Sequence, residues 1–212
     1  MIEIIPAILP KSFDELEECL QRLQGVAPTV QIDLVDVNVL LGHEALPFWE
    51  EFDFECDVML ANPAREMQSC IDIGASRVVV HARAANAHEA LQSLQDFRGG
   101  NLPVLVGVAL ASTDTLDALA PYEELYDFVQ VMGIANVGHQ GQPFDEKCLA
   151  LIALLRATYP ELVIQVDGAV TLSRVRALVD AGANRLVVGS ALMQAENPGD
   201  VYKALYTEAN AQ

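Results

Sequence analysis

Basic residues are scarce in this sequence, and long apolar runs are absent. Only 12 Lys and Arg accompany 30 Asp and Glu, so the formal net charge is −18. A nucleic acid or an anionic membrane surface would be repelled by this charge, so we expect neither as a partner. Charged or polar residues interrupt every apolar run before the roughly 20 residues that a membrane helix needs. We therefore expect no membrane-spanning segment.

Cysteine motifs and a targeting segment are also missing. The four cysteines, Cys19, Cys56, Cys70 and Cys148, include no C-x-x-C pair of the kind found in zinc and redox sites. The first residues, MIEIIPAILPK, lack the basic stretch with which a signal peptide begins. We therefore expect reduced thiols in the core of a cytoplasmic protein. The hydrophobic fraction of 52%, with 13 Gly and 10 Pro, excludes a disordered or collagen-like chain.

Eight short apolar runs, rich in β-branched residues, alternate with segments of helical periodicity along the whole chain. The runs span residues 3–8, 29–35, 56–60, 77–82, 104–110, 128–134, 162–168 and 185–190. Eight β/α units in 212 residues match the number and roughly the size of a small (β/α)8 barrel. The alternative, a doubly wound open sheet, usually has a glycine-rich turn after its first strand, and the turn AILPKSF has no glycine. We predict an α/β fold, a single (β/α)8 TIM barrel domain over residues 1–212.

Helix signals are clearest in four of the intervening segments. Ser12 and Glu15 have the spacing of a capping box, which predicts a helix that ends at Gly25. Asn-Pro pairs open two further segments, and Pro suits the first position of a helix. The four predicted helices occupy residues 12–25, 62–74, 171–182 and 197–209.

Aspartates occur near the ends of three predicted strands. In VQIDLVDVN, the alternation of a barrel strand directs Gln31 and Asp33 inward. The same alternation directs Asp57 inward on the third strand and Asp167 inward on the seventh. Active sites of (β/α)8 barrels lie at the carboxyl ends of the strands. The three aspartates are therefore predicted to converge on one mouth of the barrel.

A structural role must be weighed against a chemical one. Each aspartate alone could equally be a helix cap or a turn residue, and this role suits Asp36 best. Three carboxylates meeting at one mouth would repel one another unless a cation binds or a pKa rises. Oxygen ligands of this kind favour Mg, Mn or similar metals over a thiolate zinc site.

Eight motifs follow one another along the chain. They are EIIPAIL, QIDLVDV, DVMLANP, GASRVVVHARA, GVALASTDT, VQVMGIANVGHQGQPF, VDGAV and AGANRLVVGSALM. Each resembles a motif of the ribulose-phosphate 3-epimerase family; QIDLVDV, for example, is similar to H-I-D-V-M-D-G. Their order and spacing agree with that family over nearly the whole chain, so the sequence is identified as a divergent member.

The resemblance implies an isomerase of pentose phosphate metabolism that moves a proton at C3 of a ketose phosphate. One residue takes the proton on one face of the sugar and another returns it on the other face, while a metal steadies the enediolate. By resemblance, Asp33 and Asp167 hold the base and acid positions. The implied cofactor is a divalent cation (Zn, Mn, Mg or Fe) on Gln31, Asp33, Asp57 and Asp167. Met59 and Met132 match methionines that pack near the reacting carbons, although core filling would explain them equally well.

Several positions depart from the family pattern. Gln31 and Asp57 stand where the family has histidine ligands, Ala7 stands where it has a serine, and Ala111 stands where it has an asparagine. The loop P-G-F-G-G-Q is replaced by NVGHQGQ. The acid/base pair is therefore retained in a changed surrounding.

A phosphate site is expected in the loops after the seventh and eighth strands. Small residues there allow backbone N–H groups to approach an anion, which an acidic chain needs because it has few cations. Tight βα turns would be the structural reason for the same glycines. The predicted phosphate- and substrate-binding residues are Ala7, Met59, Met132, Gly141, Gln142, Gly168, Ala169, Gly189 and Ser190.

The sequence is also compatible with other functions of the same barrel. A decarboxylase of the same superfamily would carry Asp-x-Lys-x-x-Asp, but DLVD has no lysine. A non-catalytic phosphate-binding barrel is the third possibility, since fold alone does not decide function. His81 matches a family histidine, His139 could reach the mouth, and Lys11 is a poor Schiff-base candidate. By analogy with the family we expect a sugar-phosphate ligand and a homo-oligomer.

Overall fold

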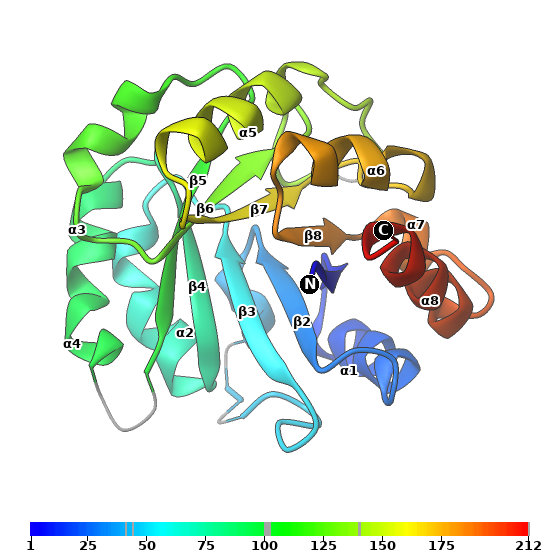
Figure 1. Ribbon diagram of the computed structural model, residues 1–212. Coiled ribbons are helices and arrows are strands. Elements are labelled where there is room, and N and C mark those ends of the chain that lie inside the picture. Colours follow the sequence, from blue (N-terminus) through cyan, green and yellow to red (C-terminus); the bar gives the residue numbers. More distant parts are fainter. Residues whose placement is uncertain (41, 44, 100–102, 140, 212) are drawn as a thin grey trace.

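Eight parallel strands close into a barrel, and helices surround it (Figure 1). The computed structural model describes residues 1–40, 42–43, 45–99, 103–139 and 141–211. The strands follow one another in chain order around the closed sheet, so the predicted (β/α)8 barrel is confirmed. They are β1 (Glu3–Ile8), β2 (Thr29–Leu34), β3 (Asp53–Val58), β4 (Ala75–His81), β5 (Leu105–Leu110), β6 (Phe128–Met132), β7 (Val163–Asp167) and β8 (Arg185–Val188).

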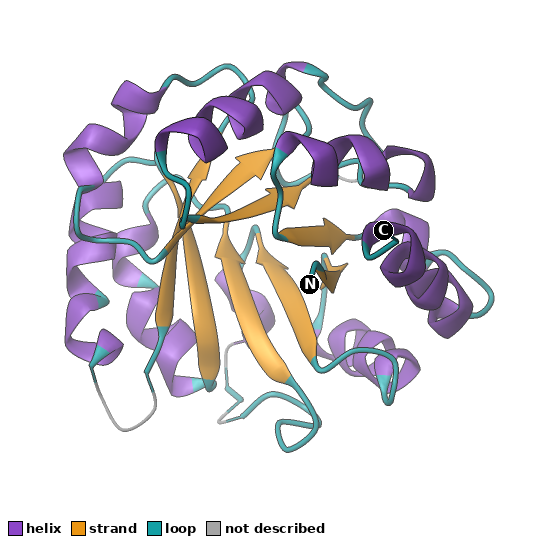
Figure 2. Ribbon diagram, viewed as in Figure 1, coloured by secondary structure: helices purple, strands orange, loops and turns teal. Residues whose placement is uncertain are grey.

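The helices form the outer layer, and Figure 2 shows them around the strands. Two begin at caps that the sequence predicts: Ser12 Oγ accepts a hydrogen bond from the Glu15 N–H, and Asn197 Oδ1 accepts one from the Gly199 N–H. The α-helices are α1 (Phe13–Leu23), α2 (Met67–Asp72), α3 (Ala87–Ser93), α4 (Gln95–Arg98), α5 (Lys147–Thr158), α6 (Leu172–Ala181), α7 (Ser190–Met193) and α8 (Pro198–Ala209). Short 3-10 turns are η1 (Val37–Leu40), η2 (Pro63–Arg65) and η3 (Leu116–Tyr122). Among the described residues, no helix is long and apolar enough to cross a membrane.

Two sequence predictions need correction in their boundaries. Strand β3 begins at Asp53, three residues before the predicted run, because its inward positions are carboxylates and so break the apolar pattern. The helix predicted over residues 62–74 is divided into η2 and α2. Asn62 makes no capping hydrogen bond there; its Oδ1 instead accepts from Nδ2 of Asn86. Gln140, inside the loop NVGHQGQ, lies outside the described residues.

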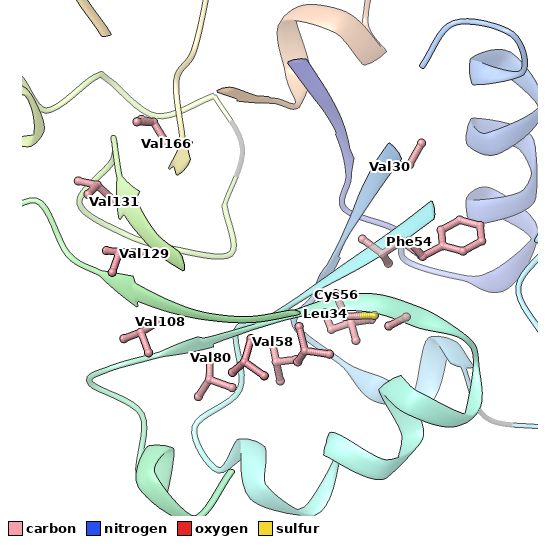
Figure 3. Close-up of a cluster of buried hydrophobic side chains, with 14 of the residues drawn as sticks. Val30, Leu34, Phe54, Cys56, Val58, Val80, Val108, Val129, Val131 and Val166 are labelled. Atoms are coloured by element: carbon pink, nitrogen blue, oxygen red, sulfur yellow. The ribbon is translucent and has the colours of Figure 1, made fainter. Parts of the chain in front are cut away.

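The main hydrophobic core lies between the strands and the helices. Outward-facing side chains of alternate strand residues fill it, among them Val30, Phe54, Val80, Val129 and Val166 (Figure 3). Burial of this apolar surface is the dominant favourable term in folding. Three of the four cysteines are fully buried in this layer as free thiols, in agreement with the sequence prediction.

The inside of the barrel is unusually polar. Gln31, Glu55, Gln130 and Gln165 are all 0% exposed. Nε2 of Gln165 donates to Glu55 Oε1 at 2.5 Å and to Gln130 Oε1 at 2.7 Å. Such a layer is stable only where its members satisfy one another, because an unpaired buried polar group is strongly unfavourable. Hydrogen-bonded amides therefore replace much of the Val, Ile and Leu that usually fill these barrels.

Below this layer, two arginines and a glutamate occupy the amino-terminal end of the barrel. Arg77 and Arg185 both form ion pairs with Glu3, at 3.0 and 3.1 Å. Arg77 Nη1 also lies 3.7 Å from Glu55 Oε2. The polar interior thus continues from the mouth of the barrel to its opposite end.

One apolar contact inside the barrel joins neighbouring strands: Gly107 on β5 faces Phe128 on β6. A Cβ atom at Gly107 would lie 2.5 Å from Cζ of Phe128. The guanidinium of Arg185 covers the Phe128 ring at 4.9 Å. The Phe128 ring can therefore occupy this position only because residue 107 is a glycine.

We expect Gly107→Ala to lower the free energy of unfolding by about 1–3 kcal/mol, because the added methyl overpacks the barrel interior. Chemical denaturation measures this change. Gly99→Ala is the control, since a Cβ atom there meets nothing within 4 Å. The double variant Gly107→Ala/Phe128→Leu should lose less stability than the sum of the single changes. Additive losses would contradict the predicted contact.

The buried Glu55 predicts an unusual pH dependence of stability. Burial outweighs the attraction of Arg77 and raises the pKa of Glu55 from 4.5 to about 7. The folded state therefore binds a proton that the unfolded state has lost. This contribution is fully present below pH 4.5 and is lost as the pH rises to about 7; it amounts to about 3 kcal/mol.

In metal-free protein, we expect Glu55→Gln to reduce the loss of unfolding free energy between pH 5 and pH 7. Asp167 contributes with the same sign, so part of the slope remains. Denaturation curves over this range provide the measurement, with the exposed Glu50→Gln as the control. An unchanged slope in Glu55→Gln would show that Glu55 does not titrate in this range.

Candidate active site

Three buried aspartates meet at the carboxyl end of the barrel. Asp33 and Asp57 are cross-strand partners on β2 and β3, and Asp167 ends β7. One ligand atom from each carboxylate lies within 4.8 Å of the others. Strands β1 and β8 separate β2 from β7, so Asp33 and Asp167 approach the mouth from different sides. The predicted convergence of the three side chains is present.

Amide and imidazole groups hold these carboxylates. Gln31 Nε2 donates to Asp33 Oδ1 at 2.7 Å and lies 3.4 Å from Asp167 Oδ2. Asp57 is held on both sides, by Gln130 Nε2 at 2.7 Å and by His81 Nε2 at 2.9 Å. Asp57 is therefore a fully buried group beneath the mouth, whereas Asp33 and Asp167 face the cavity above it.

The electrostatics of the cluster favour protonation. Burial, followed by repulsion from Asp167 and Asp57, raises the pKa of Asp33 well above its usual range. Burial and the Asp57 carboxylate raise the pKa of Asp167 to about 7. Burial alone would lower the pKa of His81, but the adjacent Asp57 carboxylate raises it overall. A carboxyl group that titrates near neutral pH, as Asp167 does, is suited to both accept and return a proton.

One cavity of about 240 Å³ lies above the carboxylates. Asp33 and Asp167 are part of its wall, together with all nine residues predicted from the sequence to bind phosphate or substrate. Those nine are Ala7, Met59, Met132, Gly141, Gln142, Gly168, Ala169, Gly189 and Ser190. The structure brings these positions together; their binding roles stay predictions.

The loop after β7 has the backbone that an anion site needs. Gly168 and Ala169 both have positive φ, at 108° and 53°. A Cβ atom at Gly168 would lie 2.8 Å from Ile134, so this turn requires glycine. Within the described part of the chain, the backbone N–H groups of Ala169 and Ser190 donate to no other backbone group. Both are therefore available to a ligand in the cavity.

A second cavity of about 290 Å³ adjoins the first and shares Met59 and Met132 with it. His81 and Ala111 line this second cavity, so His81 reaches the mouth from the side opposite the β7 loop. His139 lines the first cavity, as its place in the loop suggested. Lys11 is exposed and lines neither cavity.

Two further residues, Asp36 and Arg174, lie near the site. The Asp36 carboxylate accepts a hydrogen bond from the Asn38 N–H at 2.9 Å, which agrees with the structural role expected for it. Arg174, in the first turn of α6, was not predicted as a site residue although it lines the main cavity. Its position one turn after the β7 loop was the available signal.

The three carboxylates fit a hard divalent cation. Their ligand atoms are close together, and burial followed by repulsion between the carboxylates raises the pKa of Asp33 and of Asp167. The orientation of the Gln31 amide does not suit its predicted role as a metal ligand. Its nitrogen faces the carboxylates, and its Oε1 lies 3.4 Å from Nε2 of Gln165. Its amide would have to turn over to offer oxygen to a metal.

Comparison with known proteins agrees with this geometry. A model of the ribulose-phosphate 3 epimerase family matches residues 3–193. The ribulose-phosphate 3-epimerase of Schizosaccharomyces pombe is 32% identical over 214 residues, which cover 96% of this chain and 92% of that protein. The ribulose-phosphate 3-epimerase of Aquifex aeolicus is 26% identical, with 92% and 90% covered.

Solved structures show that the fold is shared more widely. The 3-keto-L-gulonate-6-phosphate decarboxylase of Vibrio cholerae superimposes with a TM-score of 0.71 at 14% identity, covering 99% of this chain and 97% of that chain. The 3-hexulose-6-phosphate synthase of Salmonella typhimurium gives 0.71 at 14% identity, with 98% of each chain covered. These likenesses establish the barrel alone. The match to the family model and the curated relatives show that the chain belongs to the ribulose-phosphate 3-epimerase family.

Proposed function

We propose that this protein interconverts two epimers of a ketose phosphate at C3. Of Asp33 and Asp167, one takes the C3 proton and the other returns a proton to C3. The observation that carries the proposal is that two buried carboxyl groups with raised pKa values face one cavity. The wall of the same cavity contains the turns after β7 and β8, each with one glycine, Gly168 and Gly189. Membership of the epimerase family supports the choice of reaction.

The arrangement suits a reaction on two faces of one carbon. Asp33 and Asp167 come from strands that lie on different sides of the mouth. One carboxylate takes the C3 proton, which leaves an enediolate, and the other carboxyl group returns a proton to the opposite face. The two groups exchange roles when the reaction runs in reverse. The pKa of Asp33 is raised well above its usual range and that of Asp167 to about 7, so each group can hold a proton to return as well as accept one.

A divalent cation at Asp33, Asp57 and Asp167 belongs to this proposal. When bound, such an ion stabilises negative charge on the enediolate oxygens. The oxygen-only donor set supports Mg or Mn over Zn or Fe. The chain's own contribution is to hold Asp57 rigidly through Gln130 and His81, so that its carboxylate cannot turn away from the cluster.

The ligand class and cellular setting are further parts of the proposal. We infer a sugar phosphate as the small-molecule ligand, with its phosphate at the loops after β6, β7 and β8. The charge of −18 supports the absence of nucleic-acid and anionic-membrane partners. A cytoplasmic location and a homo-oligomeric state are carried over from the family resemblance.

A non-catalytic phosphate-binding barrel is the second candidate. It is favoured by one observation: Asp33, Asp57 and Asp167 already accept hydrogen bonds from protein groups, as structural carboxylates do. A decarboxylase is less well supported, because no lysine lines the main cavity among the described residues.

Proton exchange at C3 separates these functions. Wild-type protein should exchange the C3 proton of D-ribulose 5-phosphate, or of another ketose phosphate, with deuterated water, as followed by NMR. Asp33→Asn and Asp167→Asn should each slow this exchange by about 10²–10⁴-fold, because each removes one proton-transfer group. Asp36→Asn, outside the cavity, is the control and should exchange normally. Exchange no faster than buffer with several ketose phosphates would refute the epimerase proposal.

Metal binding is tested separately in protein stripped with chelator. Added Mn²⁺ or Mg²⁺ should raise the melting temperature, by linkage worth about 2.7 kcal/mol at 100 times the dissociation constant. Asp57→Asn should abolish this rise, because it removes a ligand charge, whereas Asp36→Asn should retain it. If neither metal analysis of the purified protein nor titration with several divalent ions detects binding, the metal part of the proposal fails.

A further inference from the structure

Arg174 is the only lysine or arginine among the described residues that line the main cavity. It belongs to the first turn of α6, directly after the β7 loop that contains Gly168 and Ala169. None of the sequence motifs points to it, and the proposed proton transfer does not use it. Its place in the cavity wall therefore needs a separate explanation.

The guanidinium of Arg174 is held in one orientation. Nη1 donates to the carbonyl oxygen of Ala169 at 2.9 Å and lies 3.4 Å from Thr171 Oγ1. The planar group also stacks over the Phe144 ring, with 4.9 Å between Cζ and the ring centroid. Its Nε and Nη2 atoms donate to no group within the described part of the chain. The Nε and Nη2 N–H groups, which form one edge of the guanidinium, thus remain for a ligand.

Charge makes this arrangement unusual for the chain. The sequence has 30 acidic residues for 12 basic ones, so carboxylate partners are plentiful. Arg174 nevertheless forms no ion pair with any described residue, although it is half-buried. Arg176, only two positions further along α6, pairs with Asp180 at 2.9 Å. A half-buried arginine without a carboxylate, at the edge of a cavity, is suited to an anionic ligand.

We propose that Arg174 binds the phosphate group of the substrate and makes the site selective for phosphorylated ketoses. Its remaining edge, with the Nε and Nη2 N–H groups, matches two phosphate oxygens, and the backbone N–H groups of Ala169 and Ser190 complete the site from the adjacent turns. The inference rests on the proposed function, because that function supplies the phosphate ester. It extends that function by giving a role in phosphate binding to Arg174, which is the single arginine or lysine that the described residues contribute to the cavity wall.

The carboxylates in the cavity wall oppose the binding of an anionic substrate. A phosphate dianion must enter a cavity whose wall already contains Asp33 and Asp167. Backbone N–H groups offer only partial charges, so they offset this repulsion weakly. A guanidinium at the rim, on the β7 side where the anion loop lies, supplies the attraction. The alternative is that Arg174 only fastens the β7 loop through the Ala169 carbonyl.

Binding of inorganic phosphate is the first test. Isothermal titration with wild type, Arg174→Met, Arg174→Lys and Arg176→Met separates the two roles, since Arg176→Met removes the same charge outside the cavity. We expect Arg174→Met to weaken phosphate binding by about 10- to 100-fold. Arg174→Lys should show an intermediate loss, and Arg176→Met should match wild type. Equal affinity in wild type and Arg174→Met, or no binding by wild type, would overturn the proposal.

Kinetics with the phosphorylated and unphosphorylated ketose provide the second test. Arg174→Met should raise KM for the phosphate ester by about 10- to 100-fold and leave kcat within about threefold. Its kcat/KM for the unphosphorylated ketose should equal that of wild type. An equal loss with both substrates would indicate a merely structural role for Arg174.

The two proposals fail in distinguishable ways. If phosphate binding depends on Arg174 but no ketose phosphate exchanges its C3 proton, the epimerase proposal fails and the phosphate site stands. If exchange occurs and Arg174→Met leaves KM unchanged, the Arg174 proposal fails and the epimerase proposal stands.

Discussion

Three carboxyl groups buried at one end of a closed parallel sheet determine which side chains can fill the inside of the barrel. Asp33, Asp57 and Asp167 repel one another and are removed from water, so each requires donors from within the barrel. Gln31, Gln130 and His81 provide those donors, and the oxygens of the glutamines then need partners of their own. Gln165 meets that need one layer further down, because its Nε2 donates to both of these glutamine oxygens as well as to Glu55. The polarity of the barrel interior is thus a consequence of the site at its mouth.

The division between the two faces of the sheet follows from this requirement. Apolar burial, which dominates folding, is concentrated between the strands and the helices, where Val, Leu and Phe side chains pack (Figure 3). The inner face carries the carboxyl groups of the site. Burial there raises the pKa of Glu55 as well as those of Asp33 and Asp167. A protein built this way is less stable at pH 7 than at mildly acidic pH through these groups. The site and the pH dependence of stability therefore have one origin.

Strand and helix periodicity predicted the fold and the inward aspartates, and the family resemblance predicted most of the other cavity residues. Eight β/α units defined the barrel, and strand alternation placed Asp33, Asp57 and Asp167 on its inner face. Patterns failed where the determining contact crosses the barrel. Glu55 interrupts an apolar run, so β3 was predicted three residues short. The partners of Gln130 follow from closure of the sheet, because closure brings together residues that no local spacing connects.

Two substitutions against the family pattern change the site, and one of them, Asp57, adds negative charge. The resemblance places neutral histidines where this chain has Gln31 and Asp57. Asp57 adds a carboxylate, and Gln31 offers a donor to Asp33 in place of a ring nitrogen that could hold a metal. The extra negative charge attracts a divalent cation more strongly, yet it also opposes an anionic substrate in the same cavity. A positive group near the anion loop becomes more valuable as the carboxylate count rises. Arg174, held by Ala169 and Phe144 on the β7 side, is the group that the chain offers there.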